Sequence, residues 1–177
     1  MFDAQDKKMD EKFEKRMDKL EDEIWAIRKI LEITFERYTT AWIHDRVEYI
    51  TKEKGPPGSY TSDHKIVDVD GFMTGTKGFE VDLDVYGTSP LHVVAEYKSV
   101  ITSHDANLKR KALEKVQLFC KKVKFLEHRV GTAPLAFFCV GDIDPSLVSE
   151  INTILDIVGA ILVAFVQKDD EISPAIL

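Results

Sequence analysis

The sequence predicts an α/β protein in which a mixed central sheet is flanked by helices and preceded by a coiled-coil helix. Three observations support this fold class. Near the N-terminus, apolar residues recur at alternating spacings of 4 and 3. In the middle of the chain, charged and apolar residues alternate with period 2, as they do in β-strands. Near the C-terminus, two short apolar segments each follow a helical pattern, which is typical of buried parallel strands.

Length and composition indicate one folded domain with an appendage. The chain has 177 residues, of which 44% are hydrophobic, so a sizeable core can form. The formal net charge of −7 at pH 7 argues against a protein that coats nucleic acid non-specifically, but it leaves room for a local basic surface. Cys120 and Cys139 stand among apolar neighbours and are expected to be reduced and buried.

The sequence suggests a cytoplasmic protein. The first residues are highly charged and contain no apolar stretch of the kind found in signal peptides. The longest apolar run, residues 157–166, is too short to span a bilayer. We therefore expect no contact with a membrane.

Residues 1–34 are predicted to form a coiled-coil oligomerisation helix. Residues 5–33 are rich in charge and contain no Gly or Pro. The apolar seam places Met17, Ile24 and Leu31 at heptad position a, and Phe13, Leu20 and Ile27 at position d. We expect a homo-oligomer that associates through residues 9–34. The alternative is an amphipathic helix that lies on its own domain.

Residues 35–177 are predicted to form the α/β domain. A helical pattern continues, or resumes after a bend, and stops before Gly55-Pro56-Pro57-Gly58. The elements expected after it are strands at 64–69, 79–86 and 91–100, a helix from a Ser103 cap to about 128, a strand at 134–140, a helix from Asp144-Pro145 to near 159, and a strand at 160–166. The tail beyond this last strand is polar.

Charged side chains gather on one face of two neighbouring predicted strands. Glu80, Asp82 and Asp84 share a face of the first strand, and Glu96 and Lys98 share a face of the next. A short turn can fold the two strands into a hairpin, which would bring carboxylates and a lysine together. Such a group can hold a divalent metal and activate a water.

These residues and their order resemble the PD-(D/E)xK nuclease superfamily, which has the restriction-endonuclease-like fold. The resemblance rests on Asp82 within a strand and on Glu96-Tyr97-Lys98 after the apolar run Val93-Val94-Ala95. It also rests on the order helix, three strands, helix, strand over about residues 35–140. More narrowly, the chain is similar to archaeal members that carry an N-terminal coiled coil.

The resemblance implies a Mg²⁺- or Mn²⁺-dependent enzyme that hydrolyses DNA phosphodiester bonds. Asp82 and Glu96 would be the first metal ligands, with Asp84 as an alternative and the backbone carbonyl of Tyr97 as a further oxygen donor. Lys98 would orient the attacking water or stabilise developing negative charge. The rival interpretation of Glu96 and Lys98 is a solvated strand face.

Additional acidic residues remain open as site residues. Glu80 can be an outer ligand, and many family members add a carboxylate from the first helix, for which Glu36 and Glu48 are the candidates here. Each of these three also fits an ordinary solvent-facing acid. The family often has a Lys or Gln on the helix after the Glu-x-Lys strand, and Lys111, Lys115 and Gln117 are possible matches.

The helix that follows the Glu-x-Lys strand is locally basic. Residues 103–131 contain eight Lys or Arg and three Asp or Glu, a balance of 8 − 3 = +5. The residues expected to contact nucleic acid are Lys109, Arg110, Lys111 and Lys115. The alternative is an ordinary solvated helix face.

Two other functions compete with DNA cleavage. The domain can keep the nuclease fold without activity and act as a scaffold or nucleic-acid-binding protein through its coiled coil. It can also cleave RNA or another phosphodiester. Oligomerisation would bring at least two active sites together, which by analogy suits double-strand cutting or branched substrates.

Overall fold

The chain is an α/β protein whose mixed six-stranded sheet is flanked by helices, which confirms the predicted fold class at this level. A computed structural model describes residues 3–53, 59–168 and 171–177. Within these ranges the side chains of residues 3–13, 18, 21, 25, 27–33, 167, 168 and 171 are not described. The chain divides into two units, Met1–Thr34 and Phe35–Leu177.

The first unit belongs to a long helix, α1 (Asp3–Thr51). Of the six predicted heptad residues, the side chains of Met17, Leu20 and Ile24 are described, and they are 43%, 51% and 49% exposed. The other three, Phe13, Ile27 and Leu31, lie outside the described side chains. The coiled coil therefore stays a prediction. In the described ranges, no helix has an apolar stretch long enough to cross a bilayer.

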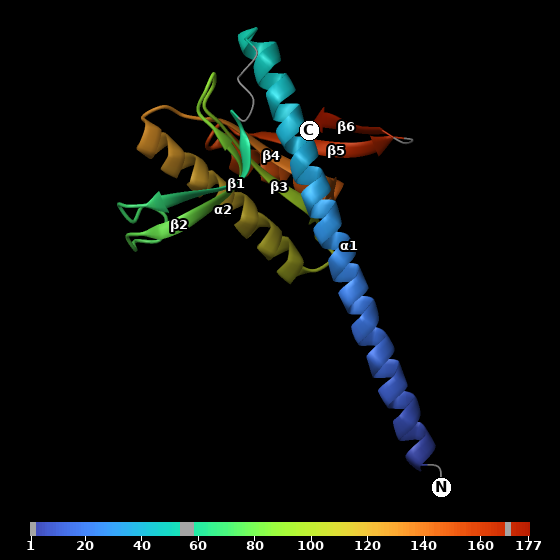
Figure 1. The fold of residues 1–177 in the computed structure, drawn as a ribbon. Coiled ribbons are helices and arrows are strands. Elements are labelled where there is room, and N and C mark those ends of the chain that lie inside the picture. The colour runs from blue at the N-terminus through green and yellow to red at the C-terminus, as the bar shows by residue number, and fades with distance from the viewer. Residues whose placement is uncertain (1–2, 54–58, 169–170) are drawn as a thin grey trace. The chain divides into compact units, whose positions relative to one another are not determined.

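The sheet of the second unit keeps the strands in chain order (Figure 1). Its strands are β1 (Thr61–Asp68), β2 (Phe79–Gly87), β3 (Val93–Ile101), β4 (Leu135–Ile143), β5 (Ile161–Lys168) and β6 (Glu171–Ile176). The pairs β1–β2, β2–β3 and β5–β6 are antiparallel, whereas β3–β4 and β4–β5 are parallel. The prediction of parallel apolar strands near the C-terminus is thus confirmed.

The last strand, β6, lies in the polar tail, for which no strand was predicted. It pairs with β5 in a register that runs from Lys168↔Glu171 to Val163↔Ile176. It is an edge strand with no neighbour on its outer side, so polar residues and Pro174 are tolerated there. The polarity of the tail is therefore that of an edge strand.

Helices cover both faces of the sheet. On one face, α2 (Ala106–Val130) and α3 (Val148–Asp156), which follows the short 3₁₀ helix η1 (Pro145–Leu147), pack on β4 through side chains such as Phe119, Phe138 and Leu155. On the other face, the C-terminal part of α1 contributes Ile43 and Val47 to a second apolar cluster. The sheet is therefore the middle of three layers, as Figure 1 shows.

The start of α2 differs from the prediction. The carboxylate of Asp105, not the hydroxyl of Ser103, accepts hydrogen bonds from the backbone N–H groups of Asn107 and Leu108. Ser103 instead donates to Asp144, at the start of η1. Asp and Ser are both common N-caps, so the local sequence did not distinguish the two positions.

Strand β2 leaves β3 soon after the turn that connects them. The two strands pair at only three positions, Val85↔Ala95, Tyr86↔Val94 and Gly87↔Val93. A Cβ atom on Gly87 would overlap the carbonyl oxygen of Ser59 and the ring of Tyr60, so glycine permits the close approach there. Beyond these pairs β2 stays with β1 as a hairpin, from Thr61↔Tyr86 to Asp68↔Phe79, with an interruption at Asp84. This divergence leaves the remainder of β3 unpaired with β2.

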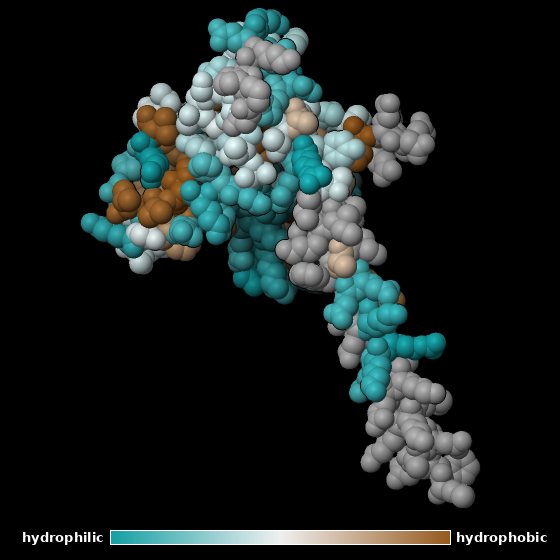
Figure 2. Space-filling view, viewed as in Figure 1, coloured by the Kyte–Doolittle hydropathy of each residue, from teal (hydrophilic) through white to brown (hydrophobic). Residues whose placement is uncertain are grey.

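The far end of the β1–β2 hairpin carries exposed apolar side chains, which Figure 2 shows as a brown patch. Val67, Val69, Phe72 and Phe79 are 39–59% exposed. The ring of Phe72 stacks on His128 of α2 with 5.3 Å between the centroids. The hairpin end is thus attached to the C-terminal part of α2.

Candidate functional site

A carboxylate occupies the point where β2 and β3 separate. The backbone N–H of Tyr97 would find its acceptor on β2 if the ladder continued, but the strands have already diverged there. Asp84 Oδ2 accepts this hydrogen bond instead, at 2.8 Å from the Tyr97 nitrogen. The divergence therefore fixes Asp84 between the two strands, close to the middle of β3.

Lys98 joins Asp84 to a second carboxylate. Its Nζ atom lies 2.8 Å from Oε1 of Glu96 and 3.7 Å from Oδ2 of Asp84. Glu96 and Lys98 are two residues apart on β3, so their side chains leave the same face of the strand. Both carboxylates thus converge on one ammonium group.

The second oxygen of Glu96 is held by a lysine of α2. Lys122 Nζ donates to Glu96 Oε2 at 2.7 Å, and the two residues are 8% and 5% exposed. A buried carboxylate is tolerable when it is paired and fully hydrogen-bonded, and here each Glu96 oxygen has an ammonium partner. We call Asp84, Glu96, Lys98 and Lys122 the carboxylate–lysine cluster.

Sequence reasoning missed Lys122 as a site residue. It was counted in the basic helix, but Lys111, Lys115 and Gln117 were the positions matched to the family. A signal was present, because Lys122 stands three residues after Phe119 and four before Leu126, on the apolar stripe that faces the sheet. A charge on a buried stripe needs a partner in the core.

The charges of the cluster balance, since two carboxylates and two ammonium groups give −2 + 2 = 0. Burial and the nearby charge of Glu96 raise the pKa of Asp84, while Lys98, the Tyr97 N–H and Lys122 act in the opposite direction. The pKa of Asp84 is therefore above that of an ordinary aspartate. A neighbouring cation would favour the ionised carboxylate.

The structure does not bring Asp82, the predicted first ligand, to the carboxylate–lysine cluster. Its side chain is 73% exposed, and Oδ1 lies 3.5 Å from Lys65 Nζ on β1. Glu80 is also exposed and lies 3.6 Å from the same ammonium. The predicted alternation fails along β2, because Val81 and Leu83 pack in the apolar cluster that includes α2 whereas Val85 packs in the cluster that includes α1. β2 has separated from β3 at Asp82, and Asp84 is the acid that contacts Lys98.

The two helix carboxylates lie on α1, which packs on the face of the sheet opposite α2. Glu48 is exposed near the end of the helix. Glu36 is half-buried, and the neighbouring Phe35 stacks on Tyr97 with 5.1 Å between the ring centroids. Of the two carboxylates, Glu36 is therefore the one that adjoins a residue in contact with β3.

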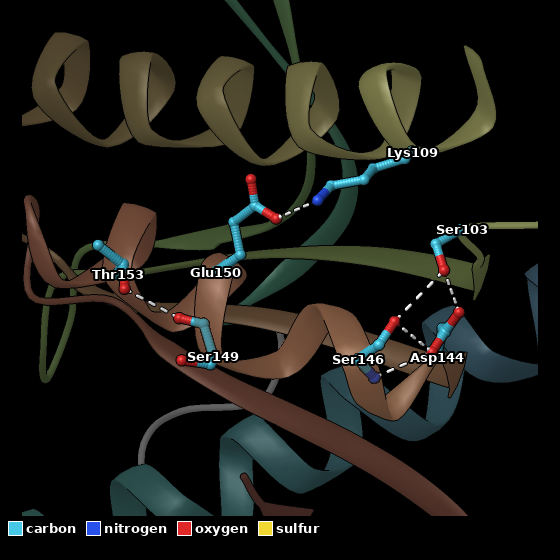
Figure 3. A network of polar contacts seen from close by, with 7 residues as sticks. All are labelled: Ser103, Lys109, Asp144, Ser146, Ser149, Glu150 and Thr153. Carbon is cyan, nitrogen blue, oxygen red and sulfur yellow. Dashed lines mark hydrogen bonds and ion pairs between the residues drawn. The ribbon is translucent and has the colours of Figure 1, made fainter. Parts of the chain in front are cut away.

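Of the four residues of α2 that were predicted to contact nucleic acid, two form ion pairs with acidic residues. Lys109 lies 2.7 Å from Glu150 of α3, and Arg110 lies 2.6 Å from Glu114. Figure 3 shows Lys109 reaching α3 near the contacts that join Ser103, Asp144 and Ser146. Lys111 and Lys115 are exposed.

Lys111 and Lys115 stand on the same edge of α2 as Lys122, because spacings of 4 and 7 residues keep them on one side of the helix. Within the described part of the chain, neither lysine has an ion pair. They are therefore the basic residues of this helix best placed to meet a phosphate beside the cluster.

The donor set fits a hard divalent cation in ligand type. Mg²⁺ prefers oxygen ligands and keeps several waters, so two carboxylates and one carbonyl are sufficient. Asp84 and Glu96 already converge on a cationic group, the Lys98 ammonium. The fit requires this ammonium to move. Among the residues whose side chains are described, no three His, Cys, Asp or Glu side chains are grouped as metal ligands.

Comparisons with protein-family models, with curated proteins and with solved structures give no match for this chain. Its function is therefore inferred from the geometry and charges of the carboxylate–lysine cluster and from the lysines beside it.

Proposed function

We propose that the protein is a metal-dependent nuclease of the PD-(D/E)xK type that hydrolyses DNA phosphodiester bonds. The observation that carries the proposal is the convergence of Asp84 and Glu96 on Lys98, at the point where β2 leaves β3. Two acids and a lysine in this arrangement combine a seat for a cation with a group that can act on a phosphate.

Each residue of the cluster has a role in this mechanism. Asp84 and Glu96, with the carbonyl of Tyr97, would hold Mg²⁺ or Mn²⁺, which would supply a water of lowered pKa and offset phosphate charge. Lys98 orients the water or stabilises negative charge that develops on the phosphate. Lys122 keeps the Glu96 carboxylate in position through its 2.7 Å hydrogen bond.

Binding of the polyanion is assigned to the exposed lysines of α2. Lys111 and Lys115 are free to form contacts with phosphate, whereas Lys109 and Arg110 already neutralise Glu150 and Glu114. Lysine–phosphate contacts release counter-ions and therefore supply salt-dependent affinity. The overall charge of −7 makes this local basic edge the favoured approach for DNA.

Self-association through residues 9–34 would bring at least two such sites together. Met17, Leu20 and Ile24 are large apolar side chains that stay 43–51% exposed in the single chain. Exposed apolar residues with heptad spacing favour helix pairing. Two sites in one oligomer suit double-strand cleavage or branched DNA.

Cleavage of plasmid and single-stranded DNA with Mg²⁺ or Mn²⁺ tests the proposal, with RNA as competitor. We expect nicked and linear products from the native protein and at least a hundredfold slower cleavage by Lys98→Ala, on the scale of losing a charge-stabilising group. Undiminished cleavage by Lys98→Ala and Glu96→Ala would exclude this site. More efficient competition by RNA than by DNA would change the substrate class and leave the site in place.

A scaffold or nucleic-acid-binding function is the second candidate, and the neutrality of the cluster favours it. Buried, internally balanced ion networks also occur as structural features. In that case Lys98→Ala and Glu96→Ala would lower the stability of the fold, and neither they nor the native protein would cleave DNA. Absence of metal-dependent cleavage by the folded native protein, together with retained self-association, would support this alternative.

A further inference from the structure

The six-stranded sheet has two edge strands, β1 and β6, at its opposite ends (Figure 1). Within the described part of the chain, neither strand pairs with another on its outer side. Such an edge presents backbone N–H and C=O groups to which a strand of another molecule can add. Every copy of this chain carries the same two edges. The backbone groups that face outward therefore decide whether copies can join into one sheet.

At β6, a single hydrogen bond shows which residues face outward. The backbone N–H of Leu177 donates to the carbonyl of Leu162 at 3.2 Å, one step beyond the last pair of the β5–β6 ladder. In an antiparallel ladder, hydrogen-bonded pairs alternate with pairs whose backbone groups point away from each other. The pair Phe165↔Pro174 is three steps from this bond, so it is of the second kind. The backbone of Pro174 therefore points to the open edge.

Proline at this position removes a donor that an added strand would need. Pro has no backbone N–H, and its ring fills the direction in which that N–H would point. By the same alternation, the outward-facing N–H groups on its two sides belong to Ile172 and Ile176, each two residues away. The side chain of Pro174 is exposed, so it contributes little to the core. Its main physical effect is thus on the outer edge of β6.

At β1, a side chain of α2 and a local change of backbone occupy the outer edge. Nη1 of Arg129 donates to the carbonyl of Val67 at 2.7 Å. The next carbonyl, that of Asp68, accepts from the N–H of Gly78 within the hairpin, so alternation directs Val67 outward. Asp63 has a φ of 52°, and the ladder with β2 is interrupted there. A left-handed residue turns the backbone away from the extended path that a partner strand follows.

We propose that Pro174 and Arg129 close the two edges of the sheet to strand addition, so that copies of this chain do not join into one continuous sheet. Asp63 adds to the block at β1. The blocks matter most when copies associate through residues 9–34, because tethering raises the effective concentration of the edges. Assembly is then confined to the helix. This inference does not depend on nuclease activity, since it concerns backbone groups outside the carboxylate–lysine cluster.

The block at β6 is tested with two valine variants of the full-length chain. Pro174→Val restores the outward N–H, whereas Ser173→Val adds the same side chain at an exposed neighbour whose backbone faces β5. Light scattering over a concentration series measures growth beyond the native mass. We expect the association constant for this growth to rise about tenfold or more in Pro174→Val, on the scale of one added hydrogen bond, and less than about twofold in Ser173→Val. Equal values for the two variants would overturn the role of Pro174.

The block at β1 is tested in the same way. Arg129→Ala frees the carbonyl of Val67, and Lys124→Ala removes the same charge from another exposed position of α2. We expect the association constant to rise about threefold or more in Arg129→Ala, a smaller effect than at β6 because Asp63 still interrupts the edge. No difference between Arg129→Ala and Lys124→Ala would overturn the block at β1.

Amide hydrogen exchange, followed by nuclear magnetic resonance, tests the edge geometry itself. In the native protein, the N–H groups of Ile172 and Ile176 should exchange faster than that of Ala175, which faces β5. In Pro174→Val, the exchange of Ile172 and Ile176 should slow as the protein concentration rises. Growth of mass without this slowing would overturn addition at the β6 edge. None of these measurements uses DNA or metal, so their failure and that of the proposed function are distinguishable.

Discussion

Glu96 is an acid in the core of the domain, 5% exposed, with an ammonium group on each carboxylate oxygen. A carboxylate at this depth is costly unless it is paired and hydrogen-bonded. Lys122 supplies one partner from α2 and Lys98 supplies the other from β3. The pairing explains how a charged side chain can occupy the middle of a central strand.

The first prediction at the residue scale concerns Lys122. We expect Lys122→Met to lower the free energy of unfolding by about 1–3 kcal/mol, because one oxygen of buried Glu96 loses its partner. Urea denaturation followed by circular dichroism measures this change. In the double variant with Glu96→Gln the loss should be smaller than the sum of the two single losses. Additive losses would contradict the coupling of the two side chains.

The second prediction concerns Asp144, whose carboxylate accepts hydrogen bonds from Ser103, from the Ser146 hydroxyl and from the Ser146 backbone N–H. These bonds lower its pKa from 3.8 to about 2. Since the pKa is lower in the folded state, Asp144 stabilises the fold above pH 3.8 and this contribution is lost as the pH falls towards about 2.

Melting temperatures of the native protein and Asp144→Asn, measured across this pH range, test the assignment. The native protein should melt higher at neutral pH, and the difference should shrink as the pH falls below 3.8. A difference that does not change with pH would show that the three contacts do not stabilise the ionised carboxylate.

Residue types and spacing predicted part of the site. Alternation along β3 correctly placed Glu96 and Lys98 on one face, because that rule depends only on local geometry. It could not choose between Asp82 and Asp84, because strict alternation would place both on one face of the strand. The choice depends on where β2 diverges from β3, and that divergence arises from tertiary packing.

At the scale of elements, α2 links the site to the proposed DNA contact. Lys115 and Lys111 precede Lys122 by 7 and 11 residues, which corresponds to about 10 Å and 16 Å along the helix axis. These distances are comparable to the span of a few phosphates along one DNA strand. A strand with a phosphate at the cluster can therefore run along this edge.

The third prediction tests this edge. The double variant Lys111→Ala/Lys115→Ala should weaken DNA binding and reduce the slope of log affinity against log salt by about 1–2, since each phosphate contact contributes about 0.7–0.9. Fluorescence anisotropy at several salt concentrations measures both. The matched control is Lys121→Ala/Lys124→Ala, which removes the same charge from exposed positions elsewhere on α2. Equal effects of the two double variants would exclude a specific track.

Most elements could be predicted because their patterns are local. The apolar stripe of α2 and the continuous apolar strands β4 and β5 have clear periodicities, and the structure confirms them. Strand β6 was missed because an edge strand needs neither an apolar run nor alternation. The cap of α2 was assigned to Ser103 instead of Asp105 because the contact between Ser103 and Asp144 joins residues far apart in sequence.

At the scale of the whole molecule, the fourth prediction concerns self-association. Ile24→Asp places a charge in the proposed seam and should convert an oligomer to monomers, because position a of a coiled coil is buried between helices. Light scattering after size-exclusion chromatography measures the mass. Ala26→Asp is the matched control, since it adds the same charge at an exposed position outside the seam. A native protein that is already monomeric would contradict the coiled coil.

The most direct test of the nuclease proposal compares two aspartates of one strand. Asp84→Asn and Asp82→Asn remove the same charge from β2, but only Asp84 contacts Tyr97 and Lys98. Plasmid cleavage with Mg²⁺ should fall at least a hundredfold in Asp84→Asn and stay near the native rate in Asp82→Asn, as expected when one of the metal's few carboxylate ligands is lost. Native-rate cleavage by Asp84→Asn, with loss in Asp82→Asn, would contradict the site.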